Sequence, residues 1–274
     1  VVKGESALTT PEPPTLKPGE KRLQNIFIPF HSDGTTYETF EILETAEQAP
    51  TLTTPGKIPK TMAKIKAGEP VKIVCWGDSV TFGGDATKGN GYVSVFRRTL
   101  KKQFPKASIK VKNVSVGGSN SRQWLWPDKH KHFNPKAHQE CRWDRVASEK
   151  PDLVTIEFVN DSGLKGKTFA KTYGEILKRV NDLGAEVIFI TPHFTNMGSM
   201  RFKSQKNTQD TRAYVKELKA FAKDNDKALA DASSRWAHLW KEGIPYETLL
   251  KNGINHPDDR GHMMFVEELM RCFK

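Results

Sequence analysis

The spacing of apolar residues becomes regular after residue 70. Short apolar runs rich in Val, Ile and Leu indicate buried β-strands. These runs lie at 71–76, 108–115, 152–159, 186–191 and 228–231. Around them, apolar residues recur every three or four positions, which is the spacing of one helix face. The helical segments are 61–66, 92–100, 169–180, 214–222 and 263–273. Strands that alternate with helices predict an α/β fold, with a parallel sheet covered by helices on both faces.

The first 66 residues have a different composition. Prolines and threonines cluster there, and this composition disfavours helices. Two stretches, 25–30 and 36–43, favour extended structure instead. We therefore predict a Pro/Thr-rich arm with short strands over residues 1–66, followed by the main domain over residues 67–274.

The net charge is strongly basic, at +11 from 43 Lys and Arg against 32 Asp and Glu. Such a charge suits either solubility or an anionic partner. The lysines are scattered, with no basic helix and no aromatic RNA-binding signature, so we expect no nucleic acid partner. An acidic polysaccharide fits the same charge. No apolar run approaches the ~20 residues that cross a bilayer, so we expect no membrane partner either.

Three cysteines are spread widely along the chain, at Cys75, Cys141 and Cys272. They have no CxxC spacing, so a structural zinc site is not expected. Cys75 lies within an apolar strand and is expected to be a small buried side chain. Cys141 and Cys272 would pair only if the fold brings them together.

Polar residues follow the ends of the predicted strands, where open α/β sheets place their active sites. Ser79 stands in a Gly-Asp-Ser turn directly after the first strand. A serine hydroxyl is a poor nucleophile unless a base takes its proton, and His256 is the candidate base. The oxyanion of an acyl-transfer intermediate needs fixed donors. The backbone N–H groups of Ser79 and Gly118 and the side-chain amide of Asn160 would supply them.

Four blocks in this order resemble the SGNH (GDSL-type) hydrolase family over roughly residues 71–272. The blocks are Gly77-Asp-Ser79, Asn113-Val-Ser-Val-Gly-Gly118, Phe158-Val-Asn160-Asp161 and Asn252-Gly-Ile-Asn-His256. The resemblance implies a flavodoxin-like, three-layer α/β/α sandwich. It also implies that Ser79 is the nucleophile and His256 the base. Ser79, Gly118 and Asn160 would form the oxyanion hole, with Gly118 preferred over Gly117 because the second block aligns at its later glycine.

Two positions depart from the family pattern. Phe158 stands where the third block usually has glycine. The fourth block usually reads Asp-x-x-His, but Gly253 stands three residues before His256. Some group must still orient the imidazole and support its charged form. The candidates left open are Asn252, a backbone carbonyl in 252–255, Asp231, Asp258 and Asp259.

Other polar residues lie near the same strand ends. Arg122 follows the oxyanion loop and His193 follows the fourth strand, so both are candidate substrate contacts. Asp78, Asp161 and His262 are expected to have structural roles, as turn or helix-end residues.

A long irregular insertion separates the second and third strands. It contains Trp124 and Trp126, and we expect an aromatic loop over the cleft that would suit stacking on sugar rings. It also contains His130, His132 and His138, but no ligand spacing repeats, so we expect no metal site.

These features together predict a serine esterase that hydrolyses small acyl esters through an acyl-enzyme, without metal or cofactor. We expect O-acetyl esters on a carbohydrate, anionic carbohydrates included. One alternative is a lipase- or thioesterase-type acyl hydrolase, although no long apolar lid is visible. Another is a carbohydrate-binding relative with little or no activity, which the missing Asp-x-x-His acid supports. We expect a secreted or periplasmic protein although no signal peptide is visible, and the sequence sets no oligomeric state.

Overall fold

The computed structural model describes residues 25–27, 40–42, 57–130, 139–200, 209–241 and 244–274. The five strands predicted after residue 70 form one sheet, in which every neighbouring pair is parallel. They are β3 (Val71–Gly77), β4 (Ile109–Ser115), β5 (Leu153–Glu157), β6 (Glu186–Ile190) and β7 (Ala228–Ala230). Their spatial order is β4-β3-β5-β6-β7, which is the 2-1-3-4-5 order of flavodoxin-like folds.

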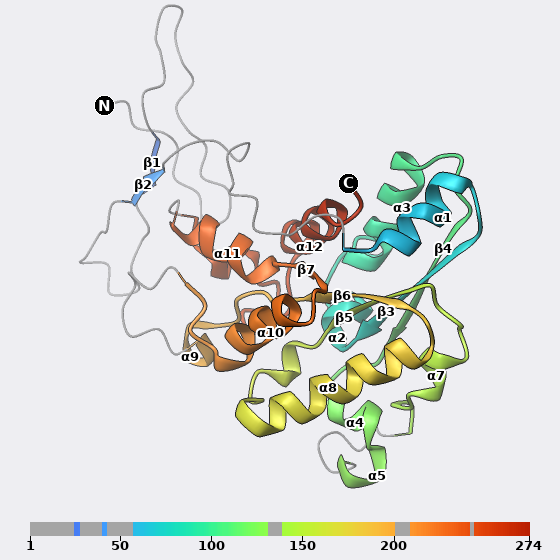
Figure 1. Ribbon diagram of the computed structural model, residues 1–274. Helices are drawn as coiled ribbons and strands as arrows, with labels where there is room; N and C mark the ends of the chain where they lie inside the picture. The colour runs from blue at the N-terminus through green and yellow to red at the C-terminus, as the bar shows by residue number, and fades with distance from the viewer. Residues whose placement is uncertain (1–24, 28–39, 43–56, 131–138, 201–208, 242–243) are drawn as a thin grey trace, which may run out of the picture.

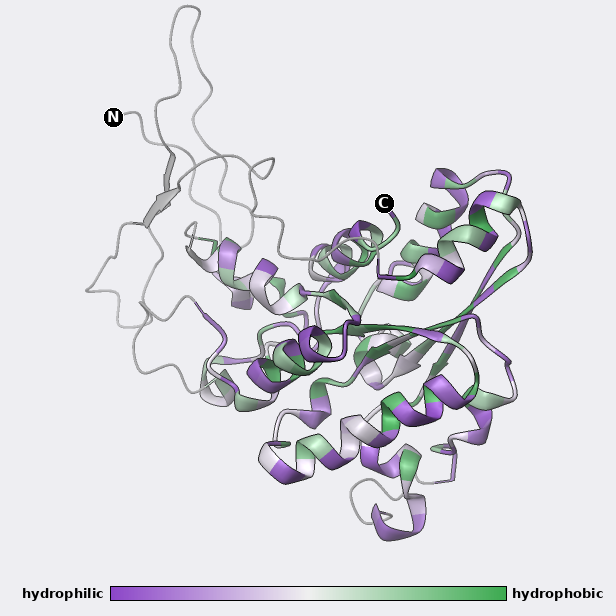
Figure 2. Cartoon of the chain, viewed as in Figure 1, coloured by the Kyte–Doolittle hydropathy of each residue, from purple (hydrophilic) through white to green (hydrophobic). Residues whose placement is uncertain are grey.

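The sheet separates two hydrophobic cores. Successive side chains of a strand point to opposite faces, so Ile73 and Cys75 enter one core while Val74 and Trp76 enter the other. Strand β5 is buried along its whole length, as expected for a central parallel strand. Figure 2 shows the central strands as predominantly hydrophobic.

Helices cover both faces of the sheet (Figure 1). On the Trp76 face lie α8 (Gly166–Asp182) and α10 (Ala213–Asp224). On the Cys75 face lie α1 (Pro59–Ala67), α3 (Tyr92–Gln103) and α12 (Asp259–Arg271). The result is the predicted three-layer α/β/α sandwich. Within the described part of the chain, no helix is both long and apolar enough to span a membrane.

Shorter elements connect these layers. They are α2 (Ser79–Phe82), α4 (Ser121–Leu125), α5 (Pro127–His130), α7 (Asp144–Ala147), η2 (Val159–Asp161), α9 (Met197–Met200), α11 (Ala232–Lys241) and η3 (Tyr246–Leu249). Helix α11 was not predicted from the sequence. It contributes Trp236 to a third, smaller core, which also contains Phe194 and Tyr246.

The arm predicted over residues 1–66 is described only in part. Strands β1 (Asn25–Phe27) and β2 (Phe40–Ile42) lie within the two predicted extended stretches and pair antiparallel. The other residues before 57 lie outside the described part. Helix α1 packs into the core of the main domain through Met62 and Ile65. We therefore propose a domain boundary near residue 57, because a boundary at residues 66 and 67 would cut through this helix.

All three cysteines are buried and free. Cys75 is a core residue of β3, as expected. Cys141 and Cys272 belong to the two different cores on opposite faces of the sheet. The fold therefore does not bring them together as a disulfide pair.

Candidate active site

The turn after β3 presents Ser79 at the carboxyl end of the sheet. Ser79 is the first residue of α2, and Asp78 caps this helix by accepting the Val80 N–H at 3.1 Å. The second carboxylate oxygen of Asp78 accepts the backbone N–H of Asn160 at 3.0 Å. Gly77 lets the turn pack closely against the end of β5, because a Cβ on Gly77 would overlap the backbone of that strand. The turn is therefore fixed both locally and to the loop after β5.

His256 contacts Ser79 from the loop that precedes α12. Its Nε2 lies 2.9 Å from the Ser79 hydroxyl oxygen. On the other side of the ring, Nδ1 lies 2.7 Å from an Oδ atom of Asp85. A tautomer with its proton on Nδ1 donates to the Asp85 carboxylate and leaves Nε2 to accept from the serine hydroxyl. Serine, histidine and aspartate thus form one continuous chain of hydrogen bonds.

Asp85 is the orienting acid that the sequence analysis did not identify. It follows Ser79 by six residues and has a φ of 61°, a left-handed conformation that Asp tolerates better than most residues. Gly84 makes room for the contact, because a Cβ there would lie 3.0 Å from Cε1 of His256. A tight turn thus returns the chain from the nucleophile to the far side of its base.

Asn252, one of the predicted candidates, shapes the loop rather than the imidazole. Its side-chain oxygen accepts the backbone N–H groups of Ile254 and Asn255 at 2.9 Å. It also accepts the backbone N–H of His256 at 3.0 Å. The side chain therefore organises the chain that leads into His256, and it does so without contacting the ring nitrogens.

The three candidate aspartates also have other partners. Asp231 forms an ion pair with Lys219 at 2.8 Å. Asp258 caps α12 by accepting a backbone N–H one turn later. Asp259 accepts hydrogen bonds from the Thr87 N–H and the Asn90 side-chain amide. Since Asp85 occupies the position at Nδ1, the prediction that one of these three groups orients His256 is corrected.

The glycine pair after β4 approaches Ser79 through Gly117, and Asn160 is joined to the Ser79 turn through Asp78. A Cβ on Gly117 would be 4.0 Å from the Cβ of Ser79, and Gly118 has a φ of 70°, a region that favours glycine. The side-chain amide of Asn160 donates to the carbonyl of Ser119 at 2.9 Å. An amide nitrogen carries two hydrogens, so this bond orients the group and leaves a second N–H. The roles of Gly118 and Asn160 in binding an oxyanion stay predictions.

Three carboxyl groups are buried at this edge of the sheet. Desolvation raises the pKa of Asp78 to about 7 and the pKa of Asp161 to about 6. Burial also raises the pKa of Glu157 well above its ordinary value, and the neighbouring Asp78 adds to this effect. Asp161 accepts hydrogen bonds from the Ser121 N–H and the Tyr173 hydroxyl, at 3.1 and 3.0 Å. These contacts are consistent with the structural role expected for Asp161.

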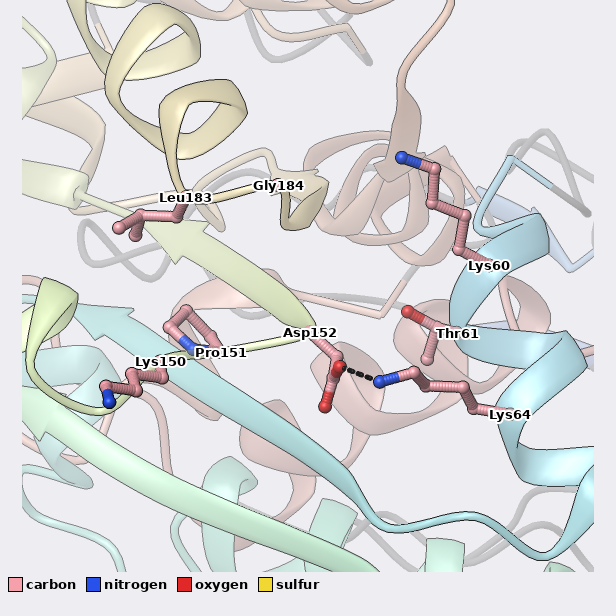
Figure 3. Close-up of a pocket in the computed structure, with 8 residues that line it drawn as sticks. All are labelled: Lys60, Thr61, Lys64, Lys150, Pro151, Asp152, Leu183 and Gly184. Carbon is pink, nitrogen blue, oxygen red and sulfur yellow. Dashed lines mark hydrogen bonds and ion pairs between the residues drawn. The ribbon is translucent and has the colours of Figure 1, made fainter.

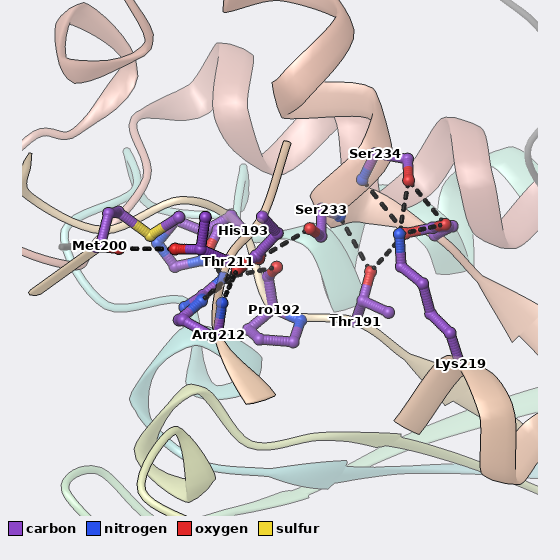
Figure 4. A network of polar contacts seen from close by, with 11 residues as sticks. Thr191, Pro192, His193, Met200, Thr211, Arg212, Lys219, Ser233 and Ser234 are labelled. Carbon is purple, nitrogen blue, oxygen red and sulfur yellow. Dashed lines mark hydrogen bonds and ion pairs between the residues drawn. The ribbon is translucent and has the colours of Figure 1, made fainter. Parts of the chain in front are cut away.

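His193 follows β6, but its side chain is completely buried. The ring centroid lies 5.1 Å from that of Trp236 and 5.7 Å from that of Phe265. The His193 carbonyl accepts a hydrogen bond from Arg212 at 2.8 Å, within the polar network of Figure 4. Burial lowers the pKa of His193 well below its usual value. An imidazole enclosed in this way does not reach a substrate, so we do not propose His193 as a substrate contact.

Arg122 is the second residue of α4, just after the glycine pair. Its side chain is half-buried, and its Nε has no hydrogen-bond partner among the described residues. A contact between Arg122 and substrate stays a prediction.

The aromatic loop expected from Trp124 and Trp126 differs in the structure. Trp124 is completely buried and its indole N–H donates to the Ser119 hydroxyl at 3.0 Å. Trp126 packs against the same core, with Lys171 over its ring. The prediction of an exposed Trp124 is therefore wrong, because the indole fills the core beneath α4. Residues 131–138, which include His132 and His138, lie outside the described part of the chain.

A cavity of about 400 Å³ lies far from these residues. Figure 3 shows that its lining includes Thr61, Lys64, Asp152 and Gly184. Lys64 and Asp152 form an ion pair there at 2.6 Å. The lining residues belong to α1 or precede β5 and β6, so they lie at the amino edge of the parallel sheet. Ser79 lies at the opposite edge. Among the described residues, no group of three or more His, Cys, Asp or Glu side chains is placed to hold a metal ion.

Comparisons with known proteins agree with this architecture. A two-domain esterase (CEX) active on acetylated mannans has a similar structure, with a TM-score of 0.61 and 20% sequence identity. The match covers 82% of this chain and 55% of that one, so the chain spans about half the length of that esterase. A variant of Axe2, an acetyl xylan esterase from Geobacillus stearothermophilus, is similar with a TM-score of 0.55 and 21% identity, over 74% of this chain and 94% of that chain.

A third similar structure is TesA, with a TM-score of 0.52 and 17% identity over 74% of this chain and 98% of that chain. At these identities the structures support the fold alone. A search of curated proteins found no match. A model of the family described as GDSL-like Lipase/Acylhydrolase matches residues 75–264, which is more than half of the chain. The chain therefore belongs to the GDSL-like lipase/acylhydrolase family, a family of SGNH-type carboxylic ester hydrolases.

Proposed function

We propose that this chain is a serine esterase that removes small acyl groups, acetyl above all, from a carbohydrate. The observation that carries the proposal is the chain of hydrogen bonds from Ser79 through His256 to Asp85. Membership of the acylhydrolase family supports the class of reaction.

The first half of the reaction forms an acyl-enzyme. The Ser79 oxygen attacks the ester carbonyl while His256 Nε2 takes the hydroxyl proton. Asp85 stabilises the imidazolium that forms. The backbone N–H groups of Ser79 and Gly118 and the side-chain amide of Asn160 bind the negatively charged oxygen of the tetrahedral intermediate. When this intermediate collapses, the alcohol leaves with the proton from His256.

The second half releases the acid. His256 takes a proton from water, and the resulting hydroxide attacks the acyl carbon held on Ser79. The same oxyanion donors stabilise the second tetrahedral intermediate. Its collapse breaks the bond to the serine oxygen, which recovers its proton from His256. The products are a carboxylic acid and the unmodified enzyme.

Three observations support a carbohydrate ester as substrate. Two of the similar structures are esterases of acetylated mannan or xylan. The net charge of +11 favours an anionic polysaccharide. Phe82, at the end of the helix that begins with Ser79, is 69% exposed and offers an aromatic face for a sugar ring. A polysaccharide substrate also favours a secreted or periplasmic location.

A hydrolase of longer acyl esters is the second candidate. Ile254, in the loop that carries His256, is 55% exposed, so both catalytic segments present apolar surface. That surface would suit an acyl chain as well as a sugar ring. A binding protein without activity has lost its support, since it rested on a missing acid and Asp85 contacts the histidine.

The experiment compares the intact protein with its Ser79→Ala variant on two sets of substrates. One set is p-nitrophenyl esters from acetate to octanoate, and the other is acetylated manno- and xylo-oligosaccharides. Ser162→Ala is the matched control, because Ser162 is an exposed serine in the loop after η2. A fluorophosphonate probe labels the nucleophile in each protein.

We expect Ser79→Ala to lose activity by about 10⁴-fold or more and to lose labelling, while Ser162→Ala keeps both. Release of acetate from the oligosaccharides supports the proposed substrate. A rate that rises with acyl chain length, without acetate release, favours the second candidate. Folded protein that neither turns over any ester nor reacts with the probe would contradict the proposed function.

A further inference from the structure

The loop that carries Asp85 is tied to helix α12. Asp259, the first residue of that helix, accepts the backbone N–H of Thr87 at 2.8 Å through one carboxylate oxygen. Its other oxygen accepts the side-chain amide of Asn90, also at 2.8 Å. Both hydrogen bonds lower the pKa of Asp259, so the group is a carboxylate at neutral pH. The carboxylate of Asp259 thus joins two points of the loop formed by residues 83–90.

One turn later, the same helix contacts residues at the two ends of this loop. His262 is completely buried, and its Nδ1 accepts the backbone N–H of Tyr92 at 3.3 Å. Tyr92 is the first residue of α3, where the loop ends. The backbone of Gly84, at the start of the loop, lies beside the same imidazole. Asp259 and His262 therefore both tie α12 to the segment between α2 and α3.

Asp85 depends on such support because its own surroundings are open. Its side chain is 44% exposed and its backbone has a φ of 61°. Within the loop, turn hydrogen bonds join Ala86 to Gly83 at 3.3 Å and Asn90 to Thr87 at 2.8 Å. Turns of this kind shape a loop but do not fix it against its neighbours. The hydrogen bond from the Gly84 N–H to the Ser79 carbonyl, at 2.8 Å, ties the start of the loop to α2. The contacts with α12 hold the part of the loop that follows Asp85.

We propose that Asp259 is a positioning residue, which holds the 83–90 loop so that Asp85 meets His256. This role rests on the proposed function, because it concerns the acid of that same reaction. Helix α12 begins three residues after His256, so the loop that carries the acid is tied to the segment that follows the base. Asp259 touches neither Ser79 nor the ring of His256, and it acts through Asp85.

The kinetic test is a double-mutant cycle on p-nitrophenyl acetate with Asp85→Asn, Asp259→Ala and the double variant. We expect Asp259→Ala to lower kcat about 10- to 100-fold with KM unchanged within about twofold, since small misplacements are costly in catalysis. Asp259→Asn keeps one acceptor oxygen and should lie between Asp259→Ala and the natural protein. The double variant should be no more than about twofold slower than Asp85→Asn alone. Asp182→Ala is the control, an exposed carboxylate with a 2.7 Å partner in α8.

A second measurement does not depend on turnover. Amide hydrogen exchange at Thr87 should be at least about tenfold faster in Asp259→Ala, and unchanged in Asp182→Ala. Losses that multiply in the double variant would overturn the proposal, because they would show that Asp259 acts independently of Asp85. Unchanged exchange at Thr87 would also overturn it. If the natural protein shows no turnover that depends on Ser79, the proposed function is contradicted. The exchange measurement then still decides whether Asp259 holds the loop.

Discussion

At the scale of single residues, the contact between Asp85 and His256 is short but not enclosed. The side chains are 44% and 22% exposed, so water screens their interaction. A hydrogen bond in such surroundings contributes little to the stability of a fold. Its value lies in holding the imidazole in one tautomer and orientation while Ser79 reacts. Activity and stability should therefore respond differently when Asp85 is changed.

We expect Asp85→Asn to lower kcat/KM by about 10²- to 10⁴-fold, because an amide does not support the imidazolium. The free energy of unfolding should change by no more than about 0.5 kcal/mol, since Asn tolerates the left-handed backbone as well as Asp does. Ester hydrolysis and urea unfolding measure the two effects. Asp226→Asn is the control, an exposed Asp with a φ of 52°. Full activity in Asp85→Asn would show that His256 needs no carboxylate.

Ser79 and His256 could be predicted because each lies in a short sequence motif at a strand or helix end. Asp85 could not be predicted in the same way, because its position depends on the path of a tight turn rather than on spacing from His256. The available signal was the pair Gly83-Gly84 directly before Asp85. Two glycines after a short helix allow the chain to fold back, and the first acid beyond them then faces the base.

At the scale of elements, the strands and main helices were predicted because their apolar faces bury against the sheet. A buried parallel strand gives a continuous apolar run, as in β5, and a covering helix gives a regular stripe, as in α8. Helix α11 escaped prediction because its Trp236 packs into a small core of loops and helix ends rather than onto the sheet. Trp236, Ala237 and Trp240 nevertheless recur at helical spacing, so the sequence does contain a signal for this helix.

Helix α1 is fixed to the sheet through its first turn. The carboxylate of Glu186, at the start of β6, accepts the backbone N–H groups of Lys60 and Thr61 at 2.9 and 2.7 Å. We expect Glu186→Ala to lower the free energy of unfolding by about 1 kcal/mol, the usual cost of losing a helix cap. The kcat should not change, because this contact lies at the amino edge of the sheet.

Urea unfolding and ester hydrolysis test this expectation on the same samples. Glu69→Ala is the control, since Glu69 is an exposed carboxylate just after α1. A loss of activity without a loss of stability would mean that the two edges of the sheet are coupled.

At the scale of the whole molecule, the buried acids link stability to pH. Asp78, Asp161 and Glu157 hold protons in the folded protein at pH values where the unfolded chain has released them. Their contribution to stability is complete below their ordinary pKa values and is lost as pH rises through the raised ones. The buried histidines His193 and His262, whose pKa values are lowered, act in the opposite direction. A variant is therefore needed to separate the acids from the histidines.

The Glu157→Gln variant measures how much one of these buried acids contributes to the pH dependence of stability. Just above the ordinary pKa of a glutamic acid, the unfolded chain releases the Glu157 proton while the folded protein, in which this pKa is raised, keeps it, so stability falls as pH rises. Removing this group should make the slope of unfolding free energy against pH less negative, by at most about 1.4 kcal/mol per pH unit for one proton. Urea unfolding at several pH values measures the slope. Equal slopes in the two proteins would show that Glu157 is ionised in the fold.

The position of helix α12 also bears on how the protein responds to heat. The helix begins three residues after His256, and its first residue, Asp259, accepts a hydrogen bond from the loop that carries Asp85. A brief local opening of this one helix would displace the base and release the acid together, while the sheet and Ser79 stayed in place. Inactivation on warming would then begin below the temperature at which the fold melts. We therefore expect loss of activity on warming to follow the opening of α12 rather than the melting of the whole sandwich.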